Sequence, residues 1–295
     1  MSETIAVVIV TYNRKALLME CIDGIFRQSR PVNKIILIDN ASSDGTYELL
    51  IKNGYLTNPL FDYVRLPVNT GGSGGFHEGV KRGFEAGYDW LWLMDDDGVP
   101  DTNCLKILAE IGEKGFKYVA PNLLDNDGIS HFQRMFENSL SNIINDRGGP
   151  FNGILINHCL IAAVGYPMKN YFLWGDEYEY TNRIWECGVP MVTVRNAVHK
   201  HKSTKFNYGK CPRSFYLARN SIYNYRLLKG IYITKRMYLL RTLNLLARLM
   251  FFGIVCFNLN QVVQTIKGVF SGIYDQLYEF QVESKWPGIN NKIKK

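Results

Sequence analysis

The sequence predicts an α/β protein with a mostly parallel sheet, flanked by helices and followed by a C-terminal helical extension. Three observations support this fold class. Apolar runs rich in β-branched residues alternate with amphipathic stretches in the first hundred residues, a spacing typical of βαβ units. Each of these apolar runs is followed by a polar or glycine-rich segment. No proline occurs from residue 215 to residue 280, so this part is expected to be helical.

The expected elements follow one another regularly up to about residue 114. Strands are predicted at 5–10, 34–40, 63–66 and 90–94, and helices at 15–28, 41–53 and 74–87. The first two strands are continuous apolar runs, a pattern of burial on both faces. Further along the chain, strands are expected at 117–124, 151–156 and 191–198, and 125–150 is polar and loop-like.

The charge of the chain divides sharply between its two parts. Residues 1–186 carry a net charge of −8 and residues 187–295 carry +15, with no acidic residue from Cys187 to Tyr274. This division favours an anionic partner, such as a membrane leaflet, a phosphorylated substrate or nucleic acid, over helices with solvated charge. The acidic first part argues against a nucleic-acid track.

We expect an α/β domain at 1–226 and a basic, amphipathic helical region at 227–295. The polar side chains of the stretch 236–257 form one narrow stripe at helical spacing: Arg241, Asn244 and Arg248. The uncharged apolar run 249–257 is too short to cross a bilayer. This stretch therefore either packs on the first domain or lies in a membrane interface, and its basic flanks favour the interface.

The termini and cysteines indicate a compartment. No basic segment precedes the first apolar run, and the six cysteines are scattered without a C-x-x-C pair. The first feature argues against a signal peptide. The scattered cysteines argue against a disulfide framework or a zinc site. We expect a cytoplasmic protein with reduced thiols, bound peripherally to the inner face of the cell membrane.

Polar clusters follow the first four predicted strands. They occupy residues 11–14, 39–45, 69–75 and 95–98. Because ligands of parallel sheets bind beyond the carboxyl ends of the strands, these clusters are expected to meet at one rim.

The aspartates after the strand 90–94 are candidate metal ligands. Asp95 and Asp97, at i and i+2, project to one side and can hold a hard cation such as Mg²⁺ or Mn²⁺, whereas Asp96 points elsewhere. His199 and His201 share one side of a later predicted strand, so either could complete the site. The alternative for the triple aspartate is a polar turn.

The glycine-rich block 69–79 fits neither a dinucleotide fingerprint nor a P-loop. His77 stands where the fingerprint needs a third glycine, and no Gly-Lys-Ser/Thr follows. What remains is a turn that lets the backbone approach a ligand before a helix N-terminus, with a flexible loop as the alternative.

A second acidic group consists of Asp176, Glu177 and Glu179, next to Trp174. Partial burial among aromatic side chains raises the pKa of a carboxylate, which suits a general base. The alternative is a helix start whose acidic residues are stabilised by the helix dipole.

Taken in order, the segments VVIVTYNR, IILIDNASSDGT, NTGGSGGFHEG, WLWLMDDD, WGDEYEYTNR and VHKHKS resemble family 2 glycosyltransferases over about residues 5–226. The resemblance implies a Rossmann-like GT-A fold and an inverting reaction. The glycine-rich block, the triple aspartate and the tryptophan before the acidic pair are most similar to the galactofuranosyltransferase and rhamnosyltransferase branches.

The resemblance also implies roles for individual residues. A nucleotide-sugar donor is expected to bind at Thr11, Tyr12, Asn13, Arg14, Asp39, Asn69, Gly71, Gly72, Gly74, Asp95 and Asp96. Mn²⁺ or Mg²⁺ is expected on Asp95, Asp97 and either His199 or His201. Glu177 is implied as the base, with Asp176 in reserve, and Trp174 as an acceptor contact.

We therefore expect a metal-dependent inverting hexosyltransferase. Its donor would be a UDP-sugar carrying galactofuranose, or next a dTDP-sugar carrying rhamnose, and its acceptor a lipid-linked or cell-surface glycan. A sugar nucleotidyltransferase would not explain the second acidic group. Intact acidic residues in both groups argue against an inactive carbohydrate- or nucleic-acid-binding module. A homo-oligomer is possible, but the sequence does not determine the oligomeric state.

Overall fold

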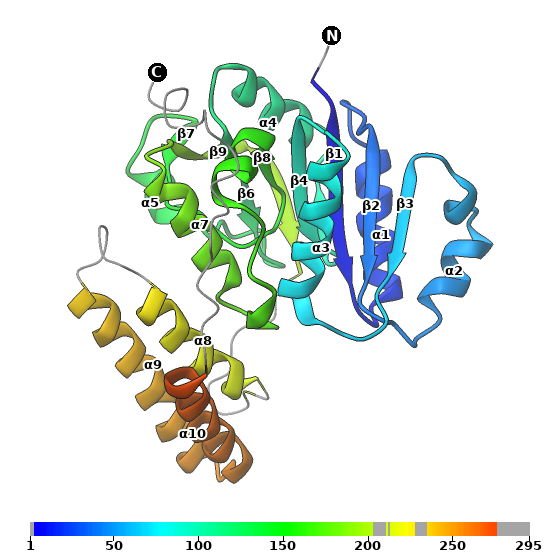
Figure 1. The fold of residues 1–295 in the computed structure, drawn as a ribbon. Helices are drawn as coiled ribbons and strands as arrows, with labels where there is room; N and C mark the ends of the chain where they lie inside the picture. The colour runs from blue at the N-terminus through cyan, green and yellow to red at the C-terminus, as the bar shows by residue number, and fades with distance from the viewer. Residues whose placement is uncertain (1–2, 203–210, 212, 228–234, 276–295) are drawn as a thin grey trace.

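The α/β fold is confirmed by a computed structural model that describes residues 3–202, 211, 213–227 and 235–275, and of 235–238 the backbone alone. Nine strands form one mixed sheet in the order β3-β2-β1-β4-β8-β6-β9-β5, and β7 pairs with β9 (Figure 1). The strands are β1 Ile5–Thr11, β2 Lys34–Asp39, β3 Phe61–Arg65, β4 Trp90–Asp95, β5 Gly98–Pro100, β6 Tyr118–Leu124, β7 Ile143–Asn145, β8 Ile154–Asn157 and β9 Met191–His201. The expected helical residues 228–234 and 276–295 lie outside the described part.

Helices cover both faces of the sheet (Figure 1). They are α1 Lys15–Phe26, α2 Thr46–Lys52, α3 Gly71–Glu85, α4 Cys104–Glu113, α5 Gln133–Glu137, α6 His158–Val164, α7 Asp176–Glu186, α8 Ser214–Leu227, α9 Lys235–Val255 and α10 Leu259–Tyr274. The odd-numbered residues of β1 pack with α1 and α4 in one apolar cluster, and the even-numbered residues pack with α3, α6 and α7 in another. This two-sided burial is the reason why the strand is apolar throughout.

The sheet changes character along its width. β3, β2, β1 and β4 run parallel, whereas β8 is antiparallel to both β4 and β6. β9 runs parallel to β6 and antiparallel to β5 and β7. The segment 125–150, expected to be a loop, contains α5 and β7; a three-residue strand that depends on pairing with β9 leaves no periodic pattern in the sequence.

The glycines of α3 let this helix lie close to the sheet. Helix α3 begins at Gly71, three residues before the expected start. Gly75, Gly79 and Gly83 recur every fourth residue, and an added Cβ at these positions would lie 2.4, 2.3 and 2.4 Å from side-chain atoms of Val10, Val8 and Leu91. Much of the glycine-rich block therefore serves close helix–sheet packing.

The C-terminal helices form a separate group below the sheet (Figure 1). Helix α8 packs on α10, where a Cβ on Gly268 would lie 2.3 Å from the carbonyl oxygen of Phe215. None of the described helices is long and apolar enough to cross a membrane. The boundary expected at residues 226 and 227 stays a prediction.

Candidate active site

A cavity of about 670 Å³ opens where β1 and β4 end. The strand register places Thr11 opposite Asp39 and Val10 opposite Asp95, so the ends of three neighbouring strands meet at this edge. The sequence-expected residues that line the cavity are Thr11, Tyr12, Arg14, Asn69, Gly71, Gly72, Asp95, Asp96, Asp97, Trp174, Asp176, Glu177 and His201.

Four of the expected site residues are not part of the lining: Asn13, Asp39, Gly74 and His199. Asp39 is buried, and its carboxylate accepts hydrogen bonds from the Ser42 backbone N–H (2.8 Å) and the Tyr63 hydroxyl (2.7 Å). The Oδ1 of Asn13 accepts a hydrogen bond from the Ser43 backbone N–H at 2.7 Å. These contacts shape the loop behind the cavity wall.

Two of the three aspartates, Asp96 and Asp97, share Arg14 as a partner. The Asp96 carboxylate accepts hydrogen bonds from the Thr11 hydroxyl at 2.7 Å and from Arg14 Nη1 at 3.3 Å. Arg14 Nη1 also lies 2.7 Å from Asp97 Oδ2. Asp95 faces the cavity at the end of β4. Arg14 thus neutralises part of the charge of Asp96 and Asp97.

Asp95, Asp97 and His201 form a cluster whose ligand atoms lie within 4.8 Å of one another. The antiparallel pairing of β5 with β9 creates this cluster, because it sets Gly98 opposite His201, whose Nε2 lies 3.1 Å from Asp97 Oδ1. Two carboxylates and one imidazole are a donor set that fits a divalent cation with preference for oxygen ligands. The residues present therefore fit Mn²⁺ or Mg²⁺.

The other expected histidine lies apart from this cluster. His199 is fully buried, and added Cβ atoms on Gly98 and Gly153 would lie 2.2 and 2.7 Å from its ring nitrogens. Burial, assisted by the charge of His201, lowers the pKa of His199 to about 3, so that its ring is neutral. Of the two histidines, the structure brings His201 to the aspartates.

The carboxylates differ in their affinity for protons. Burial, together with the charges of Asp97 and Asp96, raises the pKa of Asp95 well above its usual value. Burial raises the pKa of Asp96 to about 6. Burial would also raise the pKa of Asp97, but its contacts with His201 and Arg14 lower it overall. A bound cation would offset both the burial and the neighbouring negative charges that raise the pKa of Asp95.

The acidic pair starts helix α7 and lines the same cavity as the three aspartates. Asp176 is buried, and Glu177 is half-buried and lines the cavity. Burial and the neighbouring Glu177 raise the pKa of Asp176 well above its usual value. Asp176 therefore keeps its proton to a higher pH than an exposed aspartate does.

Trp174 precedes the acidic pair in a turn with an unusual backbone. Phe172 and Trp174 both have φ 63°, in the left-handed region that costs about 1–3 kcal/mol for a residue with a side chain. The Arg213 guanidinium stacks over the Trp174 ring at 5.3 Å from its centroid. Such strain at a cavity wall indicates that the position of Trp174 is held by its surroundings.

The cavity also contains residues to which the sequence assigned no individual role: Asn40, within the polar cluster 39–45, and Pro150, Asn152, Phe172 and Arg213. Asn40 directly follows β2, so the strand-end rule that marked Asp39 applies to it as well. It donates to the Gly71 carbonyl at 3.0 Å and accepts from the Thr70 hydroxyl at 2.9 Å. The other four lie in irregular segments where no periodic pattern identifies them.

The mixed sheet covered by helices on both faces, with a cavity at its strand ends, is the architecture expected of a GT-A fold. The family model for glycosyl transferase family 2 matches residues 6–166, more than half of the chain. The protein therefore belongs to glycosyl transferase family 2 and is a glycosyltransferase.

Similar proteins agree with this assignment. The chain is 28% identical over 219 residues to galactofuranosyltransferase GlfT1 of Mycolicibacterium smegmatis, covering 68% of this chain and 71% of that protein. The structure of S. aureus TarS 1–349 in complex with UDP-GlcNAc has a TM-score of 0.64 at 14% identity, covering 90% of this chain and 79% of that one. Mannosyltransferase PcManGT from Pyrobaculum calidifontis, in complex with GDP-Man and Mn²⁺, has a TM-score of 0.62 at 14% identity, covering 94% and 89%.

Proposed function

We propose that the protein is a metal-dependent, inverting glycosyltransferase that moves galactofuranose from UDP-galactofuranose to a lipid-linked or cell-surface glycan. One observation carries this proposal: a candidate metal cluster and a separate acidic pair line the same cavity. A transfer reaction needs both, because the leaving diphosphate must be neutralised and the acceptor hydroxyl must lose a proton. The similarity to galactofuranosyltransferase GlfT1 supports the donor sugar, with dTDP-rhamnose as the second candidate.

The strand-end side of the cavity would bind the donor. Asp95, Asp97 and His201 would hold Mn²⁺ or Mg²⁺, which, when bound, supplies positive charge to the diphosphate. Arg14, Lys202 and Arg213 also line the cavity, and their charges would favour the same anion. Asn69 and the first glycines of α3 would lie beside the donor ribose, with backbone N–H groups at a helix N-terminus.

The acidic pair Asp176–Glu177 would carry out the proton transfer. Glu177 would accept the proton of the acceptor hydroxyl. The oxygen of that hydroxyl would form a bond to the anomeric carbon, and the bond from this carbon to the diphosphate would break. The attack comes from the face opposite the leaving group, so the configuration inverts. Asp176, held protonated by burial, would orient the Glu177 carboxylate. Trp174 would bind the acceptor through its ring.

A donor screen tests the proposal. Hydrolysis and thermal stabilisation are measured with UDP-galactofuranose, dTDP-rhamnose, UDP-galactopyranose and GDP-mannose, each with and without Mn²⁺. We expect Mn²⁺-stimulated hydrolysis and the largest stabilisation with UDP-galactofuranose. Equal and metal-independent responses to all four donors would contradict the metal and donor assignments.

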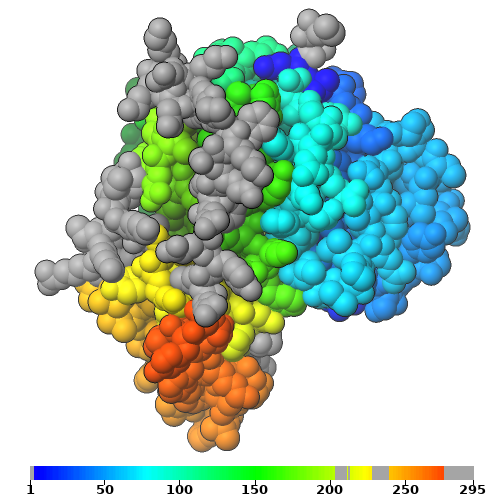
Figure 2. Space-filling model, in the orientation of Figure 1, coloured from blue at the N-terminus to red at the C-terminus, as the bar shows by residue number. Residues whose placement is uncertain are grey.

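We also propose that α9 and α10 contact the anionic inner face of the cell membrane. These helices form a lobe that projects from the sheet domain (Figure 2), and several of their large apolar side chains are exposed, namely Leu240, Leu243, Phe251, Ile254, Phe270 and Ile273. The positive charge of the C-terminal part supports an anionic surface as the partner.

Sedimentation with phosphatidylglycerol vesicles tests this contact. We expect the wild-type protein to sediment with the vesicles at low salt, and Phe251→Glu combined with Ile254→Glu to stay in the supernatant. Ile51→Glu, which changes an exposed apolar residue on α2, is the control and should still sediment. Vesicle binding by the double variant would contradict the proposal.

A further inference from the structure

The turn 171–175 connects η2, Lys169–Tyr171, to the first residue of α7. Phe172 and Trp174 have φ 63° and Gly175 has φ 92°. Residues with side chains rarely adopt this conformation, so the turn needs contacts from outside to persist. Its geometry matters because Trp174 and the acidic pair Asp176–Glu177 line the cavity directly beside it.

Helix α8 supplies those contacts through one buried amide. Asn220 is 1% exposed, and its Nδ2 donates hydrogen bonds to the carbonyl oxygens of Tyr171 (3.0 Å), Leu173 (2.7 Å) and Trp174 (2.6 Å). Arg219 Nε donates to Asn220 Oδ1 at 2.9 Å, which fixes the amide with its NH₂ group toward the turn. Aspartate would lack these donors, and no other uncharged side chain of this length carries an NH₂ group.

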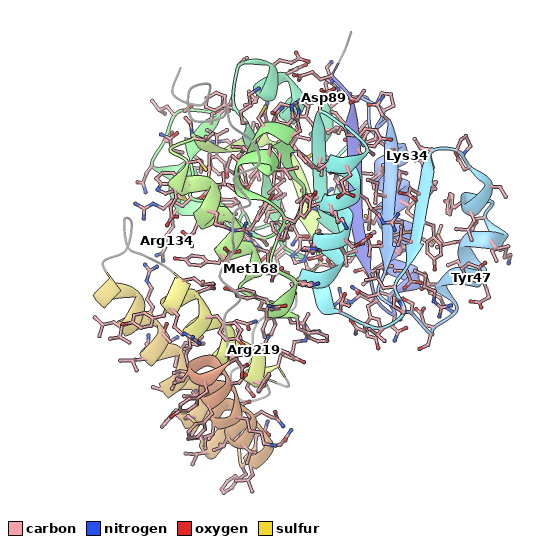
Figure 3. The ribbon with its side chains drawn as sticks, in the orientation of Figure 1. Lys34, Tyr47, Asp89, Arg134, Met168 and Arg219 are labelled. Atoms are coloured by element: carbon pink, nitrogen blue, oxygen red, sulfur yellow. The ribbon has the colours of Figure 1, made fainter. Side chains whose placement is uncertain are left out.

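Two neighbours on α8 extend the same contact. Arg219, labelled in Figure 3, donates from Nη2 to the carbonyl oxygens of Tyr171 at 2.6 Å and Asn170 at 3.0 Å. Asn224, one helical turn after Asn220, donates to the Gly175 carbonyl at 3.0 Å and accepts from the Tyr171 hydroxyl at 2.6 Å. Side chains of α8 therefore bond to the backbone carbonyls of four of the five turn residues, all except Phe172.

The other side of the turn rests on the start of α3. The Ser73 backbone N–H donates to the Phe172 carbonyl at 3.3 Å, and the Ser73 hydroxyl donates to the Lys169 carbonyl at 3.1 Å. A Cβ on Gly71 would lie 1.9 Å from the Phe172 carbonyl oxygen, so only glycine fits there. The turn is seated between α3 and α8.

We infer that Asn220 is a positioning residue for the transfer reaction: its buried amide holds the left-handed turn that presents Trp174 and the Asp176–Glu177 pair to the cavity. The catalytic consequence rests on the proposed function, whereas the structural consequence does not. Because α10 packs on α8, α10 also helps to hold the helix that bonds to the turn.

The test compares Asn220→Asp and Asn220→Ala with the wild-type protein. Asn220→Asp keeps the size and removes the donors, and Asn220→Ala keeps the test decisive if the new charge prevents folding. Asn53→Asp is the matched control. Asn53 is exposed and directly follows α2, and its Nδ2 donates to a single backbone carbonyl, that of Leu49. Ser221→Ala controls for a change on α8 that does not touch the turn.

The first readout is hydrogen–deuterium exchange of peptides that cover 171–180, and it requires no activity. We expect exchange in these peptides to become at least about tenfold faster in both Asn220 variants, while exchange in peptides from β1 and β4 stays unchanged. In the two control variants, exchange at 171–180 should equal that of the wild-type protein. Unchanged exchange at 171–180, or an equal rise throughout the chain, would overturn the inference.

The second readout separates positioning from simple stabilisation. We expect kcat for transfer to fall about 10- to 100-fold while the Kd for UDP with Mn²⁺ stays within about twofold, because misplacing a reacting group by about 1 Å has that effect on rate. A wild-type kcat for the folded variants would overturn the positioning role. Absence of transfer by the wild-type protein would refute the proposed function instead, and the exchange data would still decide whether Asn220 holds the turn.

Discussion

The two sides of the cavity are built in different ways. The strand-end side, with Thr11, Arg14 and Asp95–Asp97, lies at the ends of regular parallel strands whose register is set by backbone hydrogen bonds. The turn side, residues 171–177, has a strained backbone that is held by buried side chains from a helix more than forty residues later. In the proposed reaction, the regular sheet would position the donor-binding groups, whereas the position of the acidic pair would depend on a few long-range amide contacts.

The largest expected effect comes from breaking the strand-end side. Asp97→Ala removes a carboxylate that contacts both Arg14 and His201 and belongs to the candidate metal cluster. We expect Mn²⁺-stimulated donor hydrolysis to fall by more than about 10³-fold, since a metal contributes several kcal/mol to such a reaction. Calorimetry should also show no Mn²⁺ binding. Asp23→Ala, an exposed aspartate of α1, is the control, and full activity of Asp97→Ala would refute the metal assignment.

The turn side is tested by separating its two carboxyl groups. Glu177→Gln should lower kcat for transfer by about 10³-fold, within the range for loss of a general base, and leave donor binding intact. Asp176→Asn should have a smaller effect, because burial already keeps Asp176 protonated and asparagine retains a donor. Both effects are measured as kcat with UDP-galactofuranose and a glycan acceptor. The reverse order of the two variants would move the base to Asp176.

The pH dependence of metal binding sharpens the description of the strand-end side. The pKa of Asp95 is raised, so this carboxyl group is protonated below that pKa and must release the proton to bind a cation. The apparent affinity for Mn²⁺ should therefore increase with pH, by up to about tenfold per pH unit for each proton released. Calorimetric titrations between pH 5.5 and 7.5, in buffers of different ionisation enthalpy, measure both quantities. An affinity independent of pH would contradict a protonated Asp95 in the metal-free protein.

A smaller effect, on stability alone, is expected from the packing of α3. Gly79→Ala would place its Cβ 2.3 Å from a Val8 methyl group in the sheet, and the resulting overpacking should lower the free energy of unfolding by about 1–3 kcal/mol. At Gly72 nothing lies within 4 Å of an added Cβ, so Gly72→Ala is the control and should change stability by less than about 1 kcal/mol. Urea denaturation measures both. Equal stabilities would show that α3 does not lie as close to the sheet as described.

The same difference explains what the sequence could and could not reveal. The α/β class and the first four strands were predictable, because burial on both faces leaves continuous apolar runs such as 5–10. The choice between His199 and His201 was not, because it depends on the pairing of the three-residue strand β5 with β9. Nor did any pattern mark Asn220, a polar residue whose partners are backbone atoms about 50 positions earlier. The glycine-rich block 69–79 predicts a turn that approaches a ligand, but the sequence alone does not reveal that Gly75, Gly79 and Gly83 pack against the sheet.

Calorimetric titration of the metal-bound wild-type protein, Asp97→Ala and Glu177→Gln with UDP-galactofuranose tests most directly whether the two sides act separately. We expect Glu177→Gln to bind the donor with the wild-type Kd and to transfer sugar about 10³-fold more slowly, and Asp97→Ala to lose Mn²⁺-dependent donor binding. Equal loss of donor binding in both variants, or sugar transfer by Glu177→Gln at the wild-type rate, would contradict the division of the cavity into a donor-binding side and a proton-accepting side.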